Sequence, residues 1–126
     1  MYKYYNANPN NRKIEDCTIR ALAVAEDISW QKAYDMLSES ARDLGLMLSD
    51  VRAIEHFLDM RYERVPVHER TVGEFIDNHP KGTYLITMPG HITVLKGSKY
   101  NTEIKNFNYD IFDPSKRNIW GAWEVL

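Results

Sequence analysis

The only cysteine of the chain, Cys17, has sequence surroundings that favour a reactive thiol. The run Glu15-Asp16-Cys17-Thr18-Ile19-Arg20-Ala21-Leu22-Ala23 predicts the start of a helix, with Asp16 as the N-cap and Cys17 as the first helical residue. A thiol at that position faces the positive end of the helix dipole and the unpaired N–H groups of the first turn. Both lower the pKa of a thiol, and the thiolate is the reactive form. The sequence therefore predicts a nucleophilic cysteine.

A histidine and two carboxylates that can assist this thiol follow far downstream. His91 lies in the strand-like segment Gly90-His91-Ile92-Thr93-Val94-Leu95, and Asp110 and Asp113 lie in Tyr109-Asp110-Ile111-Phe112-Asp113. An imidazolium beside a thiol, with the helix dipole, lowers the thiol pKa to about 4, which stabilises the thiolate by roughly 6 kcal/mol. A carboxylate on the far ring nitrogen fixes the tautomer of the histidine. Cysteine, histidine and carboxylate in this order indicate acyl-transfer chemistry.

The composition predicts one globular domain without a nucleic-acid or membrane partner. A chain of 126 residues is long enough for one core and one domain, here residues 1–126. Its 16 basic and 18 acidic residues are interspersed and its net charge is −2, so no basic face for nucleic acid is indicated. No apolar run approaches the roughly 18 residues of a membrane span, and the N-terminus lacks the apolar core of a signal peptide. With one cysteine and no disulfide within the chain, we expect a soluble, cytoplasmic protein.

The first half of the chain carries the apolar periodicity and end signals of four helices. The expected helices are, in order, residues 17–26, residues from Trp30 to a stop at Gly45 with Ser29 as N-cap, a helix begun by Ser49 or Asp50, and a short helix from Thr71 to about residue 78. Glu74 stands three residues after Thr71, which is the spacing of a capping box.

The second half of the chain changes to β-strand composition. Strands are expected over residues 83–88, residues 91–95, a segment that ends near Phe112, and residues 118–125. Residues 96–99 predict a hairpin turn, and residues 113–115 predict a second turn. Helices first and strands second indicate an α+β fold, in which N-terminal helices pack on a C-terminal antiparallel sheet.

These segments resemble the papain-like cysteine peptidase superfamily. The likeness is carried by Asp16-Cys17 at a helix start, by Gly90-His91-Ile92-Thr93-Val94 and by Tyr109-Asp110-Ile111-Phe112-Asp113, and it covers the chain from about residue 8 to the end. The chain looks most like small bacterial and phage-borne members and, more distantly, like the C39-like bacteriocin-processing peptidases. The resemblance implies a papain-like fold, thiol-dependent cleavage of an amide, peptide or isopeptide bond, and a place in the host cytoplasm if the protein is phage-encoded. Cys17 would be the nucleophile, and His91 the general base and later the acid.

The resemblance leaves the third catalytic residue open between Asp110 and Asp113. Papain has an Asn-Ser-Trp-Gly run that resembles Asp110-Ile111-Phe112-Asp113 with Asp110 in the orienting place, whereas the Asp-Pro pattern of C39-like peptidases selects Asp113. One regular strand cannot point both side chains at His91, because the two positions differ by an odd number. The shorter step from His91 to Asp110 is nearer the usual spacing of the family. We therefore favour Asp110, with Asp113 as a turn residue before Pro114.

The resemblance also implies an oxyanion hole beside Cys17. In papain-like enzymes a glutamine six residues before the nucleophile supplies one donor, and here that position holds Asn11. The shorter side chain of Asn11 departs from the family pattern and leaves Asn8 or Asn10 as substitutes. The backbone N–H of Cys17 at the helix start would be the other donor.

No metal or cofactor is expected, and the substrate is expected to be a protein or peptide. One cysteine and four scattered histidines lack the spacing of a metal site, and no glycine-rich phosphate loop is present.

Near the C-terminus, Trp120 and Trp123 are expected in the core more than in a cleft wall.

We expect a narrow specificity. The 16 residues before Cys17 leave no room for an inhibitory pro-segment, and an unrestrained cytoplasmic protease would be harmful. Two alternatives stay open: a deamidase or transamidase that uses the same three residues, and a papain-like binding module without activity, such as a phage protein that blocks a host factor. Asn11 in place of a glutamine favours the binding module.

Overall fold

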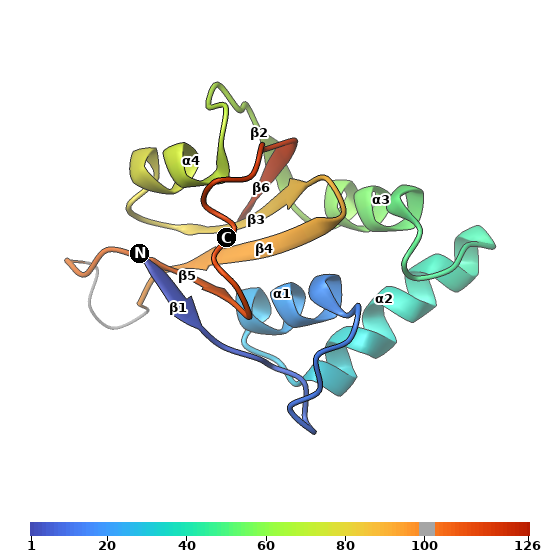
Figure 1. The fold of residues 1–126 in the computed structure, drawn as a ribbon. Helices are drawn as coiled ribbons and strands as arrows, with labels where there is room; N and C mark the ends of the chain where they lie inside the picture. Colours follow the sequence, from blue (N-terminus) through green and yellow to red (C-terminus); the bar gives the residue numbers. More distant parts are fainter. Residues whose placement is uncertain (99–102) are drawn as a thin grey trace.

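Over residues 1–98 and 103–126, which the computed structural model describes, the chain forms four helices and a six-stranded mixed sheet (Figure 1). The helices are α1 (Cys17–Glu26), α2 (Trp30–Leu44), α3 (Val51–Arg61) and α4 (Val72–Asn78). The strands are β1 (Tyr2–Tyr4), β2 (Glu63–Val65), β3 (Thr83–Met88), β4 (His91–Lys96), β5 (Phe107–Asp110) and β6 (Gly121–Val125), and their order in the sheet is β1-β5-β4-β3-β6-β2.

The four predicted helices are confirmed, and their ends lie at the predicted capping residues. The side chains of Ser29, Asp50 and Thr71 each accept a hydrogen bond from a backbone N–H two or three residues later. Asp50, and not Ser49, therefore caps α3. Gly45 ends α2 in the left-handed conformation, with φ of 70°, which glycine adopts without steric penalty. In the described part of the chain, none of these helices combines the length and the apolar character that crossing a membrane requires.

The sheet has a hydrophobic core on each face. Along β3, Leu85 packs in the core that α1, α2 and α3 form, whereas Ile86 packs in the core under α4. Trp123 and Ala122 of β6 divide between the two cores in the same way. This alternation follows from the period of two along a strand, and it explains why the central strands are apolar at nearly every position.

The sheet is mixed rather than antiparallel, which corrects the expected architecture. The first residues of the chain form β1, which pairs in parallel with β5, and β2 pairs with β6 at the opposite edge. Strands of three residues are too short to display a period of two, so no pattern predicts them. In addition, β5 ends at Asp110 rather than near Phe112, and β6 begins at Gly121 rather than at residue 118. The predicted turn over residues 96–99 includes Lys99, which lies outside the described residues.

Candidate active site

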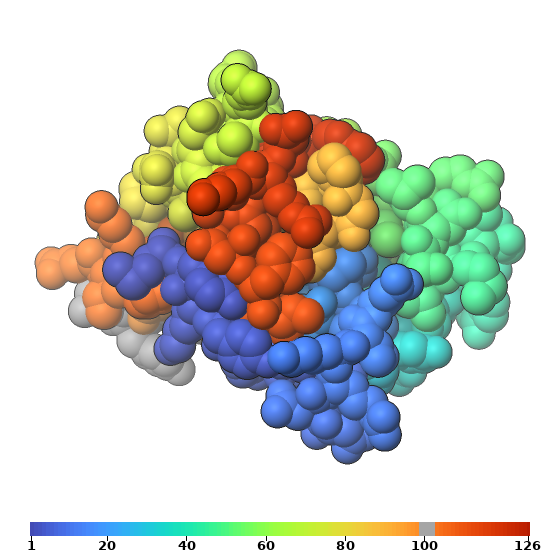
Figure 2. Space-filling model, viewed as in Figure 1, coloured from blue at the N-terminus to red at the C-terminus, as the bar shows by residue number. Residues whose placement is uncertain are grey.

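A cleft of about 600 Å³ opens beside Cys17. It lies where the start of α1, helix α3, the turn between β3 and β4 and the segment after β5 meet; these are the blue, green, gold and red-orange surfaces of Figure 2. Its apolar walls include Leu48, Val51, Ile54, Ile111, Phe112 and Trp120. Two carboxylates, Glu15 and Glu55, also line it. The cleft has the size and apolar character of a ligand-binding site and has room for more than one side chain of a larger substrate.

The sheet register brings the three predicted side chains to one end of the molecule. Cys17 is the first residue of α1, His91 the first residue of β4 and Asp110 the last residue of β5. Strands β4 and β5 are antiparallel neighbours, so the start of one lies beside the end of the other. Helix α1 packs against β4 with its N-terminus at this same end, which places the thiol beside the imidazole.

His91 lies between Cys17 and Asp110. Its Nε2 atom is 2.7 Å from Asp110 Oδ2, and the imidazole is also close enough to Cys17 for each of the two groups to shift the pKa of the other. Because Nε2 serves the carboxylate, Nδ1 is the nitrogen that remains for the thiol. The ring of Phe112 packs on the imidazole with the two ring centroids 4.6 Å apart, and the Asp110 hydrogen bond and this contact hold the ring in one orientation.

The surroundings of these groups favour a charged pair. Burial raises the pKa of the Cys17 thiol, but the hydrogen bonds with His91 and the Ile92 backbone N–H and the charge of His91 outweigh burial and lower it. Burial lowers the pKa of His91, but the hydrogen bonds and negative charges of Asp110 and Cys17 raise it to about 9. The pKa of Asp110 is lowered despite burial by its hydrogen bonds to His91 and Thr93. Thiolate and imidazolium therefore coexist between the lowered pKa of Cys17 and about pH 9.

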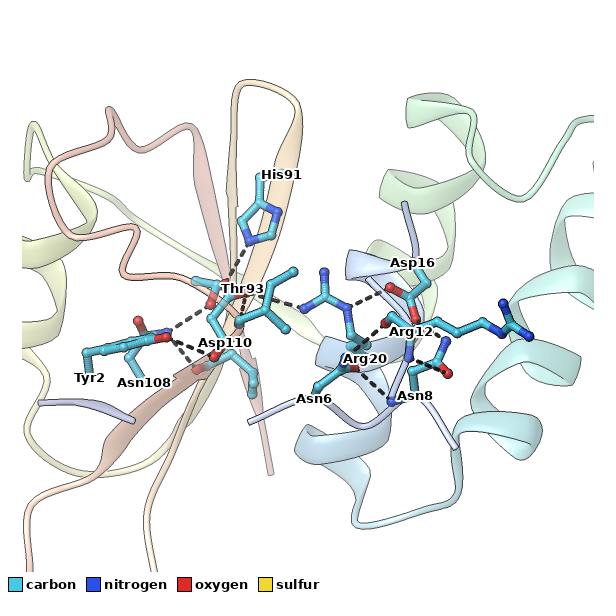
Figure 3. Close-up of polar contacts among 12 residues, drawn as sticks. Tyr2, Asn6, Asn8, Arg12, Asp16, Arg20, His91, Thr93, Asn108 and Asp110 are labelled. Carbon is cyan, nitrogen blue, oxygen red and sulfur yellow. Dashed lines mark hydrogen bonds and ion pairs between the residues drawn. The ribbon is translucent and has the colours of Figure 1, made fainter. Parts of the chain in front are cut away.

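Asp110 is held by more than the histidine, as Figure 3 shows. Its Oδ1 atom accepts a hydrogen bond from the Ile111 backbone N–H at 2.7 Å and lies 3.4 Å from Nη1 of Arg20. The Thr93 hydroxyl also hydrogen-bonds to the carboxylate, while its oxygen accepts from Asn108 Nδ2 at 2.8 Å. The carboxylate is thus buried, fully hydrogen-bonded and fixed with Oδ2 toward His91.

Asp113 lies in an exposed turn and does not reach the histidine. Its Oδ1 atom accepts a hydrogen bond from the backbone N–H of Ser115 at 3.0 Å, which is the turn role foreseen for it. It lines a different hollow, together with Tyr2 and Thr71. The structure therefore brings Asp110, and not Asp113, to His91.

Asp16 holds the N-cap position of α1, but its carboxylate caps no N–H of the helix. Its Oδ1 atom lies 2.7 Å from Nε of Arg20, and its Oδ2 atom accepts from Asn8 Nδ2 at 3.1 Å and from Trp30 Nε1 at 2.9 Å. The carboxylate thus binds the charged side chain of Arg20, one turn along the helix, instead of a backbone N–H of the first turn. The spacing of Asp16 and Arg20, four residues apart on a helix, was the available signal for this ion pair.

Asn11 is exposed in the left-handed conformation, with φ of 56°, and is not among the residues that line the cleft. Asn10 is exposed as well. Asn8 is buried, but its side chain binds Asp16 and the backbone N–H groups of Asn10 and Arg12. The side chain of Asn8 therefore serves the loop before α1, and the oxyanion role of Asn11 stays a prediction.

The two C-terminal tryptophans have different places. Trp123 is fully buried in the core, as expected, and its Nε1 donates to Asp59 Oδ1 at 2.8 Å. Trp120 is 62% exposed and lines the cleft, contrary to the expectation of core packing. Two residues, Gly121 and Ala122, separate the tryptophans, and the difference arises because Trp123 lies within β6 whereas Trp120 precedes its first residue.

Across residues 1–98 and 103–126, no three histidine, cysteine, aspartate or glutamate side chains are grouped as a metal ion requires. Fold and site together define an α+β protein with a Cys-His-Asp grouping in an open cleft. No protein-family model, curated protein or solved structure gives a significant match to the chain.

Proposed function

We propose that the chain is a thiol-dependent hydrolase of amide, peptide or isopeptide bonds, with the arrangement of a papain-like peptidase. The single observation that carries the proposal is the position of His91, whose Nε2 atom lies 2.7 Å from Asp110 Oδ2 and whose charge acts on the Cys17 thiol, beside an open cleft. Nucleophile, base and orienting carboxylate in contact are the minimum that covalent acyl transfer needs.

In the first half of the reaction the Cys17 thiolate attacks the carbonyl carbon of the scissile bond. A C–S bond forms, and the carbonyl electron pair moves onto the oxygen. The backbone N–H groups at the start of α1 stabilise this oxyanion, because no turn of helix precedes them to accept their hydrogen bonds. His91 then gives its proton to the leaving nitrogen, the C–N bond breaks, and a thioester remains on Cys17.

In the second half His91, now neutral, takes a proton from water. The resulting hydroxide attacks the thioester carbonyl, the C–S bond breaks, and the acid is released. Cys17 returns to the thiolate and His91 to the imidazolium. Asp110 stays ionised throughout and stabilises the imidazolium at both stages.

The cleft indicates the chemistry of the substrate. Its walls are apolar and carry the exposed ring of Trp120, while Glu15 and Glu55 add negative charge. A peptide with an apolar residue next to the scissile bond, and without an acidic one, fits these walls. We expect few such sequences to be cut, and extensive digestion of casein would contradict this narrow specificity.

The test is incubation of the protein with a library of proteome-derived peptides, read by mass spectrometry, with Cys17→Ala and His91→Ala in parallel. Hydrolysis adds the mass of water across two new fragments, deamidation adds about one mass unit to an intact peptide, and transamidation joins two peptides. Products that require both Cys17 and His91 support the proposal when they are hydrolytic, and point to the deamidase or transamidase alternative otherwise. An unchanged library would overturn the enzymatic proposal and leave a binding module.

A further inference from the structure

A buried arginine lies between the candidate active site and the loop that precedes α1. Arg20 is 7% exposed, and its guanidinium contacts two buried carboxylates, Asp16 through Nε at 2.7 Å and Asp110 through Nη1 at 3.4 Å. Figure 3 shows it between the two. A buried charge is retained only when it is paired, and here each end of one planar group meets a different carboxylate.

The contacts divide the oxygens of Asp110 between two tasks. Arg20 and the Ile111 N–H take Oδ1, whereas His91 takes Oδ2. If the Asp110 carboxylate could rotate freely, either of its oxygens could face the His91 imidazole, and the hydrogen bond would not fix the orientation of the ring. Donors on Oδ1 therefore fix the plane of the group and aim Oδ2 at the histidine.

Arg20 and Cys17 stand on the same helix, three residues apart, and so on the same side of α1. Asp16 holds the inner end of the guanidinium, and Asn8 and Trp30 hold Asp16 in turn. One rigid element thus carries the nucleophile and, one turn later, the cation that reaches the third member of the site on β5.

We propose that Arg20, aimed by Asp16, is a positioning residue that holds the Asp110 carboxylate in the orientation His91 requires. The inference rests on the proposed function, since its effect is read through the reactivity of Cys17. Arg20 also lines part of the cleft, but in this role it acts through Asp110 and not on the reacting atoms.

An orienting role and a purely electrostatic role of Arg20 predict opposite changes in the pKa of His91 when Arg20 is replaced. If Arg20 orients Asp110, its loss weakens the hydrogen bond to His91, so the pKa of His91 falls and that of Cys17 rises. If Arg20 acts only as a nearby cation, its loss removes a repulsion from the imidazolium, and the pKa of His91 rises. The ionisable groups that face this cluster are Asp16 before α1, Cys17 on α1, His91 on β4, Tyr109 on β5, and Tyr2 and Tyr5 from the N-terminal segment.

The experiment measures the rate of Cys17 alkylation by iodoacetamide against pH, between pH 4 and 10, in the intact protein. The variants are Arg20→Gln, which removes charge and contact, Arg20→Lys, which keeps the charge without the planar fork, and Asp16→Asn, which weakens the inner anchor. Arg61→Gln is the control, because it removes another arginine–carboxylate contact to α1, that with Glu26 at 3.0 Å, away from the cleft. Thermal melts identify the pH range in which each variant is folded.

We expect Arg20→Gln and Arg20→Lys to narrow the pH range in which thiolate and imidazolium coexist, because the pKa of Cys17 rises and that of His91 falls. A rise of about one unit in the pKa of Cys17 corresponds to an alkylation rate about tenfold lower on the acid limb. Asp16→Asn should give a smaller change in the same direction, and Arg61→Gln should match the wild type. If Arg20→Gln does not fold, the lysine and asparagine variants decide.

Three results would overturn the inference. If the pH range of the thiolate–imidazolium pair is unchanged or wider in Arg20→Gln, Arg20 is only a counter-charge. If Arg20→Lys gives the wild-type alkylation profile, the effect belongs to the charge of Arg20 and not to orientation of Asp110. A wild-type protein without thiolate below pH 7 would overturn the proposed function itself, and Arg20 would then be a structural ion pair only.

Discussion

The Nε2 atom of His91 lies 2.7 Å from Oδ2 of Asp110, although the two residues are 19 positions apart in the chain. The antiparallel pairing of β4 with β5 prepares this contact, because a register with Val94 opposite Tyr109 sets Thr93 beside Asp110, and His91 lies two positions further along β4 on the same face. The contact commits one ring nitrogen to the carboxylate and leaves the other to the thiol.

The pH dependence of Cys17 alkylation should show two steps. Below the lowered pKa of Cys17 the thiol is protonated and slow, and above it the thiolate–imidazolium pair gives a plateau that begins below the ordinary pKa of a thiol. Near pH 9 His91 loses its proton, the thiolate loses its neighbouring cation, and the rate should rise again. Hydrolysis should instead decline above about pH 9, because the leaving nitrogen then has no acid.

His91→Ala is the control for this profile. Without the imidazolium, burial is the largest remaining influence on the pKa of the thiol, and it raises that pKa. The plateau should therefore disappear, and the midpoint of the alkylation profile should lie at or above about 8.5. The same midpoint in both proteins would mean that Cys17 is a structural thiol.

Asp110→Asn and Asp113→Asn form a matched pair with the same chemical change. Asp110→Asn removes the charge that raises the pKa of His91, and we expect alkylation at pH 6 to slow by about tenfold or more. Asp113→Asn keeps an acceptor for the Ser115 N–H in an exposed turn and should leave the rate unchanged. Both rates are measured by intact-protein mass spectrometry, and the reverse ranking would make Asp113 the carboxylate that orients His91.

Trp120→Ala and Trp123→Ala should separate substrate binding from stability. Trp120 is 62% exposed on the cleft, so its loss should change the free energy of unfolding by less than about 0.5 kcal/mol while it raises KM roughly fivefold. Trp123 is fully buried, and its truncation should destabilise the protein by about 3–5 kcal/mol. Urea unfolding and steady-state kinetics on a cleaved library peptide provide the two readouts; an unchanged KM would remove Trp120 from the site.

Asn11 provides a direct test of the predicted oxyanion role. Since its side chain is exposed and outside the cleft lining, Asn11→Ala should leave turnover unchanged and destabilise the protein by about 1 kcal/mol, because alanine tolerates a φ of 56° poorly. Asn11→Gly relieves that strain and should be close to neutral. A fall in turnover of about a hundredfold in both variants would show that Asn11 does supply an oxyanion donor.

The sequence predicts the helical part of this fold well because its signals are local. Ser29, Asp50 and Thr71 mark helix starts by their own chemistry, and Gly45 marks an end. The same locality explains the two missed strands. Tyr2–Tyr4 and Glu63–Val65 become strands only because distant partners, β5 and β6, lie beside them.

The candidate site divides in the same way. Cys17, His91 and Asp110 could be proposed from residue type, order and spacing. The bridge through Arg20 could not, because the sequence predicts Asp16 only as an N-cap, and the contact of Arg20 with Asp110 joins residues 90 positions apart. Trp120 was assigned to the core because its aromatic character predicts burial, whereas its place before β6 leaves it exposed.

The pairing of β1 with β5 gives the first five residues a part in holding the backbone of Asp110. The Tyr5 N–H donates to the Asp110 carbonyl oxygen at 2.9 Å, and the Tyr2 hydroxyl donates to the same oxygen at 3.2 Å. A proteolytic cut after Tyr5 would leave β5 as an open edge, free to pair with another chain and to shift the backbone that carries Asp110. Self-association and a change in the reactivity of Cys17 should therefore arise together from damage to β1, although none of its residues belongs to the candidate site.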